Sequence, residues 1–116
     1  ALDPDIPTMV RIARLPRQPL GLVCTSELFA ESVKDSLAMA GLDFPEILVC
    51  TSRRKEDVAA LLARVCAVLV SPGRRREVER LAPGPMEVIE FVYRPDEGSI
   101  NLLRSALVER KENRLG

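Results

Sequence analysis

The segment "LGLVCTS" at residues 20–26 recurs in outline as "EILVCTS" at residues 46–52 and as "AVLVSPG" at residues 67–73. Each copy is a run of aliphatic residues that ends in small hydroxyl-bearing residues, as when a buried strand leads into a helix. The runs are apolar on both faces, which is typical of parallel strands covered by helices on each side. The three copies therefore predict an α/β fold built on a parallel sheet.

Together with the segments between and after these copies, the sequence predicts four strand–helix units. Strands are expected at residues 20–24, 47–50, 67–70 and 87–93, and helices at residues 26–40, 55–65, 72–81 and 96–111. Right-handed crossovers with helices on both faces require the winding to reverse, which gives the strand order 2-1-3-4. The expected fold class is α/β, with a single doubly wound sheet of four parallel strands and helices on both faces, flavodoxin- or Rossmann-like.

The chain divides into two parts on this interpretation. Residues 1–19, "ALDPDIPTMVRIARLPRQP", are expected to form a short linker helix, capped by Asp5 or Thr8 and ended by Pro16. This part is interpreted as a connector from an upstream domain that the chain lacks. Residues 20–116 are expected to form the α/β ligand-sensing domain.

Composition excludes several classes of protein. The 116 residues include 17 lysines and arginines and 17 aspartates and glutamates, so no overall basic charge indicates a nucleic-acid-binding protein. Histidine is absent, which removes Ser-His-Asp and Cys-His catalysis and the commonest metal ligand. We expect no metal and no cofactor. The sequence contains no long apolar run and no signal-peptide pattern, so we expect a cytoplasmic protein with no membrane partner.

The three cysteines, Cys24, Cys50 and Cys66, lie in apolar runs, and their odd number predicts buried, reduced thiols. Cys24 follows the first strand, as the phosphocysteine does in the B subunits of sugar phosphotransferases, which this position resembles. Thr25 follows it, however, with no glycine-rich loop, and no arginine stands six residues later as in cysteine phosphatases. A small enzyme or phosphocarrier with Cys24 as nucleophile is therefore the alternative function.

The residues that directly follow the first three strands are termed the first, second and third exits: residues 24–26, 50–52 and 71–73. In a doubly wound sheet these exits meet at the carboxyl edge, where ligands bind at the reversal of winding. "RRK" at residues 53–55 and "RRR" at residues 74–76 place positive charge at helix starts, against the helix dipole. Hydroxyls, helix-start amides and arginines together predict a site for an anion. The candidate ligand-binding residues are Thr25, Ser26, Thr51, Ser52, Arg53, Ser71, Gly73 and Arg74.

Two simpler explanations stay open at this point. Helix capping accounts for part of the hydroxyl pattern, with Ser26 and Ser71 as N-caps and Pro72 at the first helical position. The arginines could also be solvated and paired with acidic residues within a turn, namely Glu56, Asp57, Glu77 and Glu79. On the ligand-binding hypothesis, Arg53 and Arg74 are expected to be exposed while no ligand is bound.

The order of several segments resembles the C-terminal effector domain of GntR-type bacterial transcription regulators. The segments are "VRIARLPRQPLGLVCTS" at residues 10–26, "MAGL" at residues 39–42 and "AVLVSPGRRREVERLAPGPMEVIEFVYRPDEGSINLLRSAL" at residues 67–107. The resemblance implies a regulatory domain that senses a small anionic metabolite and controls an attached winged-helix domain. It also implies a homodimer, expected to associate through an apolar face of the first or last helix. The sequence contains no helix-turn-helix pattern, so DNA would be contacted only through a domain absent from this chain.

Overall fold

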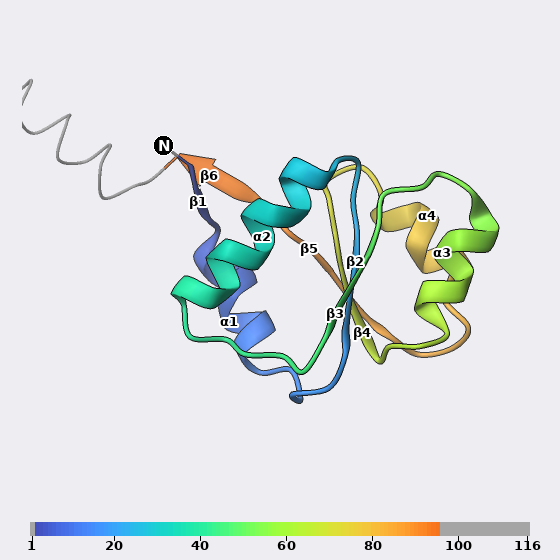
Figure 1. Cartoon of the computed structure of the whole chain (residues 1–116), viewed down its shortest axis with the longest axis horizontal. Helices are drawn as coiled ribbons and strands as arrows, with labels where there is room; N and C mark the ends of the chain where they lie inside the picture. The colour runs from blue at the N-terminus through green and yellow to red at the C-terminus, as the bar shows by residue number, and fades with distance from the viewer. Residues whose placement is uncertain (1, 96–116) are drawn as a thin grey trace, which may run out of the picture.

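The computed structural model describes residues 2–95 of the chain. Its main sheet has four strands, β2 (Leu20–Val23), β3 (Ile47–Cys50), β4 (Ala67–Val70) and β5 (Glu87–Glu90), in the order β3-β2-β4-β5 (Figure 1). Every neighbouring pair in this sheet is parallel. The predicted parallel sheet with order 2-1-3-4 is therefore confirmed.

Helices cover both faces of this sheet, as predicted. On one face lie α1 (Ile6–Ala13) and α2 (Glu27–Met39), and on the other lie α3 (Lys55–Leu62) and α4 (Arg75–Leu81) (Figure 1). The predicted helix at residues 72–81 starts three residues late, because a turn with Gly73 at a φ of 94° comes first. The predicted helix at residues 96–111 lies outside the described residues.

Alternating strand side chains build two cores. Leu22 and Leu69 are fully buried on one face, where they pack with Val33 of α2. Val68 is fully buried on the opposite face, where it packs with Leu62 of α3. Successive side chains of a strand point to opposite faces of the sheet, so strands that are apolar throughout contribute to a core on each face.

Gly21 allows α3 to approach the middle of β2 closely. A Cβ atom at this position would lie 2.8 Å from Cδ2 of Leu61 and 3.1 Å from side-chain atoms of both Val65 and Val68. The space that a side chain would need is therefore filled by the core on the α3 face. The glycine of the "LGLV" run is required by packing.

Helix α1 is part of the folded domain. Its Ile12 is fully buried in the core beneath α2, and Arg11 forms an ion pair with Glu87 of β5. Asp5 precedes the helix without a side-chain capping bond, although its carboxylate accepts a hydrogen bond from Thr8 Oγ1 at 3.3 Å. The capping expected of Asp5 is thus not observed. The existence of an upstream domain stays a prediction.

A second, two-stranded sheet was not predicted. Strand β1 (Leu2–Pro4) pairs antiparallel with β6 (Tyr93–Pro95), and the amide of Asp5 donates to the carbonyl of Val92 at 2.9 Å. The expected strand at residues 87–93 is accordingly divided into β5 and β6. Segments from opposite ends of the described chain therefore meet beside α1 (Figure 1).

Candidate site at the carboxyl edge

The strand exits lie together at the carboxyl edge of the sheet. The amide of Cys24 donates to the carbonyl of Cys50 at 3.0 Å, and the amide of Ser71 donates to the carbonyl of Val23 at 3.0 Å. These bonds extend the strand ladders by one residue beyond their ends and fix the relative positions of the three exits. The predicted meeting of the exits at the reversal of winding is confirmed.

The third exit is a tight turn that delivers Arg74 to the sheet edge. Gly73 has a φ of 94°, a conformation open to glycine but costly for residues with a Cβ atom. The amide of Arg74 then donates to the carbonyl of Ser71 at 3.1 Å, and α4 starts with Arg74 at its N-cap. Ser71 is therefore not the N-cap, and Pro72 lies in the turn before the helix. Both of these capping predictions were wrong.

Arg74 is the central side chain of this edge, because its guanidinium joins three segments. Nη1 donates to the carbonyl of Cys24 at 2.7 Å and Nη2 to the carbonyl of Ser52 at 2.9 Å. Nε and Nη2 also donate to the two carboxylate oxygens of Glu77, at 3.1 and 2.7 Å. The planar donor geometry of arginine suits this bidentate pairing. Arg74 thereby connects the first exit, the second exit and α4.

The structure corrects the expected exposure of Arg74. Only 1% of the residue's surface is accessible, although the arginine was predicted to be exposed in the absence of a ligand. A buried guanidinium keeps its charge only when hydrogen bonds and an opposite charge replace its lost hydration. Glu77 supplies the charge, and two main-chain carbonyls supply further acceptors.

The pKa values of this pair reflect their contact. Hydrogen bonding to Arg74 holds the pKa of the Glu77 carboxyl below its ordinary value, although partial burial acts in the opposite direction. The same bond raises the pKa of Arg74. Both groups are therefore charged over the whole neutral range, and the ion pair is a fixed part of the edge.

A second carboxylate of the chain occupies the third exit. The amide of Gly73 donates to Oε2 of Glu90 at 3.3 Å. The third exit thus has two negative groups of its own, Glu90 on the Gly73 amide and Glu77 on the Arg74 guanidinium. Gly73 and Arg74 have these internal partners in the positions where a bound anion was predicted.

Two of the predicted hydroxyls have partners within the chain. Ser26 Oγ accepts a hydrogen bond from the amide of Phe29 at 3.1 Å and caps α2, as predicted. Ser52 Oγ accepts from the amide of Arg54 at 3.0 Å and donates to Oδ2 of Asp57 at 2.6 Å, at the start of α3. Capping therefore explains the serine of the first exit, and local bonds in the loop before α3 explain that of the second.

Ser71 is different, because its hydroxyl has no partner. The residue is 3% exposed, and its Oγ is the one fully buried side-chain nitrogen or oxygen without a hydrogen bond in the part of the chain that the structure describes. An unpaired buried hydroxyl is costly and calls for an explanation. It lies at the reversal of winding, directly after β4 and bonded through its amide to the end of β2.

The remaining candidates are Thr25, Thr51 and Arg53. Thr25 of the first exit is exposed, Thr51 of the second exit is half-buried, and Arg53, directly after the second exit, is exposed. The charge of Arg53 contributes to the lowered pKa of Glu77, which places this arginine near the Arg74–Glu77 pair. Its exposure agrees with the prediction made for it. These three residues and Ser71 are the candidates not already used in caps or internal bonds.

The cysteines differ among themselves. Cys24 is fully buried, its thiol lies 3.3 Å from the carbonyl of Ser26, and burial raises its pKa. A raised pKa keeps the thiol protonated at neutral pH, whereas a nucleophilic cysteine reacts as the thiolate. All three cysteines are free of disulfides, but Cys66 is exposed, so the prediction that all three are buried was wrong for this residue.

Two hollows in the surface bear on possible ligands. A groove of about 450 Å³ runs beside β3 and α3 and includes Thr51 and Ser52 of the second exit. A hollow of about 360 Å³ lies at the opposite, amino-terminal edge beside Arg14 and Cys66. Of the two, only the first is continuous with the predicted site.

The described residues contain neither a cluster of metal-ligating side chains nor a membrane-spanning helix. Within residues 2–95, no three histidine, cysteine or acidic side chains are grouped as metal ligands would be. None of the helices in the same range is both long and apolar enough to traverse a lipid bilayer.

A parallel four-stranded sheet with helices on both faces and a reversal of winding between β2 and β4 defines a Rossmann-like α/β domain. The chain belongs to the family of YmtS Rossmann-like domains, which it matches over residues 21–114. It is similar to a protein from Clostridium tetanomorphum described as "Uncharacterized protein in mutS 5'region". The two are 34% identical over 89 residues, covering 77% of this chain and 89% of that protein. No solved structure matches the chain. The relation to GntR-type regulators stays a prediction.

Proposed function

We propose that this domain binds a small anionic metabolite at the carboxyl edge of its sheet and acts as the ligand-sensing part of a cytoplasmic transcription regulator. The ligand would lie over the first and second exits, in contact with Thr25, Thr51 and Arg53. The third exit would form one side of the site without binding the anion directly. Its donors, the Gly73 amide and the Arg74 guanidinium, already bind Glu90 and Glu77.

The observation that carries this proposal is the position of Arg53. It is exposed and forms no ion pair within the described residues, whereas the neighbouring Arg54 is paired with Glu56 at 3.3 Å. It stands next to the start of α3, where positive charge opposes the helix dipole. A bound anion would compensate that charge and accept hydrogen bonds from the guanidinium.

Ser71 supports the same location independently. Its buried hydroxyl has no hydrogen-bond partner among residues 2–95 and lies at the reversal of winding. A ligand oxygen, or a water molecule held by the ligand, would satisfy this hydroxyl if it reached between the exits of β2 and β4.

The network of Arg74 suggests how binding could be reported to the rest of the protein. Arg74 joins the first exit, the second exit and α4. An anion beside Arg53 would compete with Glu77 for positive charge and favour conformations in which this network is rearranged. A ligand shifts such an equilibrium only through its different affinity for the two states. In a regulator the shift would reach an attached winged-helix domain, and residues encoded upstream of Ala1 would reveal such a domain.

Thermal unfolding in sulfate tests the binding site. Sulfate should raise the melting temperature beyond the effect of chloride at matched ionic strength, because an ion that binds the folded state stabilises it by mass action. Arg53→Gln should abolish this increment while leaving the melting temperature in chloride unchanged.

Arg76→Gln is the matched control, because Arg76 is also exposed and follows the third exit, in the first turn of α4. It should keep the full sulfate increment. An equal increment in the wild type and Arg53→Gln would show that the arginines are a solvated surface and would remove the proposed site.

A further inference from the structure

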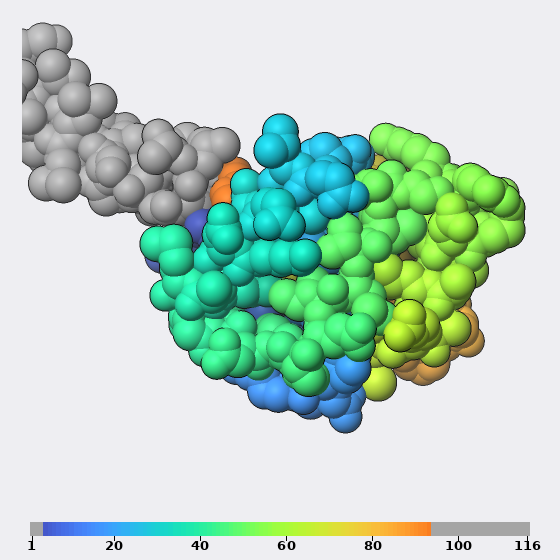
Figure 2. Space-filling view, in the orientation of Figure 1, coloured from blue at the N-terminus to red at the C-terminus, as the bar shows by residue number. Residues whose placement is uncertain are grey.

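Strand β3 has an open outer edge. It is the last strand of the sheet on one side, with β2 as its only neighbour in the described residues. The carbonyls of Glu46 and Cys50 accept bonds from β2, so the main-chain groups of the alternate residues Ile47, Val49 and Thr51 point away from the sheet. In the space-filling view, the green segment that contains β3 lies uncovered between α2 and α3 (Figure 2).

The two edges of the sheet are protected to different degrees. Edge strand β5 has Glu87 and Glu90 at its ends, and the ion pair of Arg11 with Glu87 ties α1 to this strand. Charged residues of this kind discourage pairing with another strand. Strand β3 has the sequence Ile-Leu-Val-Cys, with no charged residue and no proline. An open apolar edge favours addition of a further strand.

A groove of about 450 Å³ runs along this open edge, between β3 and one side of α3. Asp57, Ala60 and Leu61 of α3 line it, together with Arg64 in the turn that follows the helix. The three-residue spacing places Asp57 and Ala60 on one side of the helix, and Arg64 extends this row into the turn after Leu62. The side chain at the middle of the row is small, and the two ends carry opposite charges.

We propose that the chain forms a symmetric homodimer in which β3 pairs antiparallel with β3 of a second copy. The twofold axis passes through Val49, so that the two four-stranded sheets become one continuous sheet of eight strands. This places the dimer contact at β3 instead of at the first or last helix, where the sequence had suggested it. It does not depend on the anion site.

The opposite charges at the two ends of the groove select this partner. Asp57 lies at the carboxyl end of β3, because its Oδ2 accepts a hydrogen bond from Ser52 at 2.6 Å. Arg64 lies in the turn after α3, toward the amino end of the strand, and has no ion pair within the described residues. In an antiparallel twofold pairing, Asp57 of each copy faces Arg64 of the other. A symmetric interface requires such self-complementarity.

The register follows from the directions of the main-chain groups. Val49 lies opposite Val49 of the second copy, and Ile47 lies opposite Thr51, with N–H and C=O groups exchanged in each pair. Leu48 then lies opposite Cys50 in a pair without hydrogen bonds, where Cα atoms are about 4.5 Å apart. That separation lies within the range of disulfides.

Charge exchange on the full chain, followed by equilibrium sedimentation, is the first test. The wild type should be dimeric, and Arg64→Glu should weaken the dimer about tenfold or more, since each substitution acts twice in a symmetric interface. Asp57→Arg should weaken it as well. The double variant Asp57→Arg/Arg64→Glu should restore the dimer, because the opposite charges still face each other.

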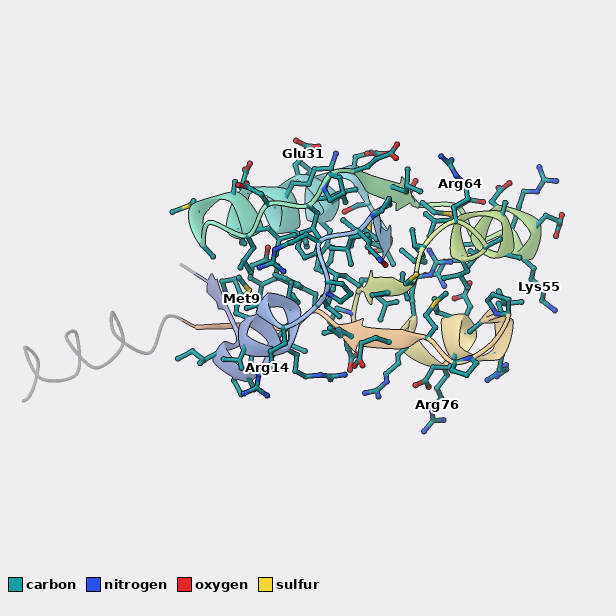
Figure 3. The ribbon with its side chains drawn as sticks, turned by 90° about the horizontal axis from the view of Figure 1, so that it is seen from below. Met9, Arg14, Glu31, Lys55, Arg64 and Arg76 are labelled. Atoms are coloured by element: carbon teal, nitrogen blue, oxygen red, sulfur yellow. The ribbon has the colours of Figure 1, made fainter. Side chains whose placement is uncertain are left out.

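Arg76→Glu is the control, because Arg64 and Arg76 project from opposite sides of the domain (Figure 3). It should leave the dimer unchanged. A monomeric wild type at the highest soluble concentration would overturn the proposal. A dimer that is insensitive to Arg64→Glu would overturn it too, since association would then use another surface.

Cross-linking tests the register separately. In a Cys66→Ser background, Leu48→Cys treated with oxidised glutathione should give a covalent dimer by a bond to Cys50 of the second copy. Adding Cys50→Ser should abolish that dimer. Circular dichroism of both variants verifies that they are folded. The proposed register would be contradicted if folded Leu48→Cys protein formed no covalent dimer under oxidation. It would also be contradicted if the covalent dimer still formed after Cys50→Ser.

Discussion

Nη1 of Arg74 lies 2.7 Å from the carbonyl oxygen of Cys24, fifty residues earlier in the chain. This bond spans the reversal of winding, because Cys24 follows β2 and Arg74 follows β4. In many doubly wound sheets a ligand lies at this place. Here a buried guanidinium of the protein holds the two exits together, and a ligand would have to bind beside it.

Arg74→Gln should lower the free energy of unfolding by about 3 kcal/mol, because it removes a buried charge and leaves Glu77 and two carbonyls without their donor. Arg75→Gln is the control, since Arg75 forms an exposed pair with Glu79 and should change stability by at most about 0.5 kcal/mol. Urea unfolding measures both. Equal small losses would mean that the network of Arg74 is not stabilising.

The Arg74–Glu77 pair should make stability depend on acid. The pKa of Glu77 is lowered in the folded state, so its contribution is complete above the ordinary carboxyl pKa of about 4 and disappears as the pH falls through the lowered value. The difference in unfolding free energy between the wild type and Glu77→Gln should therefore shrink as the pH falls below about 4. Urea titrations from neutral pH downward measure it. A constant difference would contradict the assignment.

Gly21→Ala should destabilise the fold by about 1–3 kcal/mol through overpacking against α3. The new Cβ atom would lie 2.8 Å from Leu61 Cδ2, in a filled core. Gly84→Ala is the matched control, because no atom lies within 4 Å of a Cβ built there. Thermal or urea unfolding should show a large loss in the first variant and almost none in the second. A neutral Gly21→Ala would show that α3 moves away at little cost.

Thiol alkylation near neutral pH should distinguish the cysteines and the two functional hypotheses. Cys66 is exposed and should react first, whereas Cys24 is fully buried with a raised pKa and should react only on unfolding. Mass spectrometry of digested protein after brief exposure to iodoacetamide identifies the modified residue. Rapid modification of Cys24 in folded protein would instead favour the alternative of a nucleophilic cysteine.

The strands of the main sheet and their order could be predicted from the sequence. Its strands could be placed because continuous aliphatic runs flanked by turn residues have few other stable arrangements, and their order followed from the handedness of crossovers. The cap at Ser26 was predictable as well, since it depends on atoms only three residues apart. Each of these features follows from local chemistry or from general rules of chain connection.

The roles of the charged residues depend on contacts between segments that are distant in the sequence. Arg74, Arg75 and Arg76 are adjacent and alike in sequence, yet Arg74 is buried and the other two are exposed. The difference arises because the turn at Gly73 directs one guanidinium toward carbonyls of the first and second exits, which are distant in sequence. The pairing of β1 with β6 and the burial of Ile12 likewise depend on contacts between remote segments. Such contacts form when the chain closes, and no local pattern specifies them.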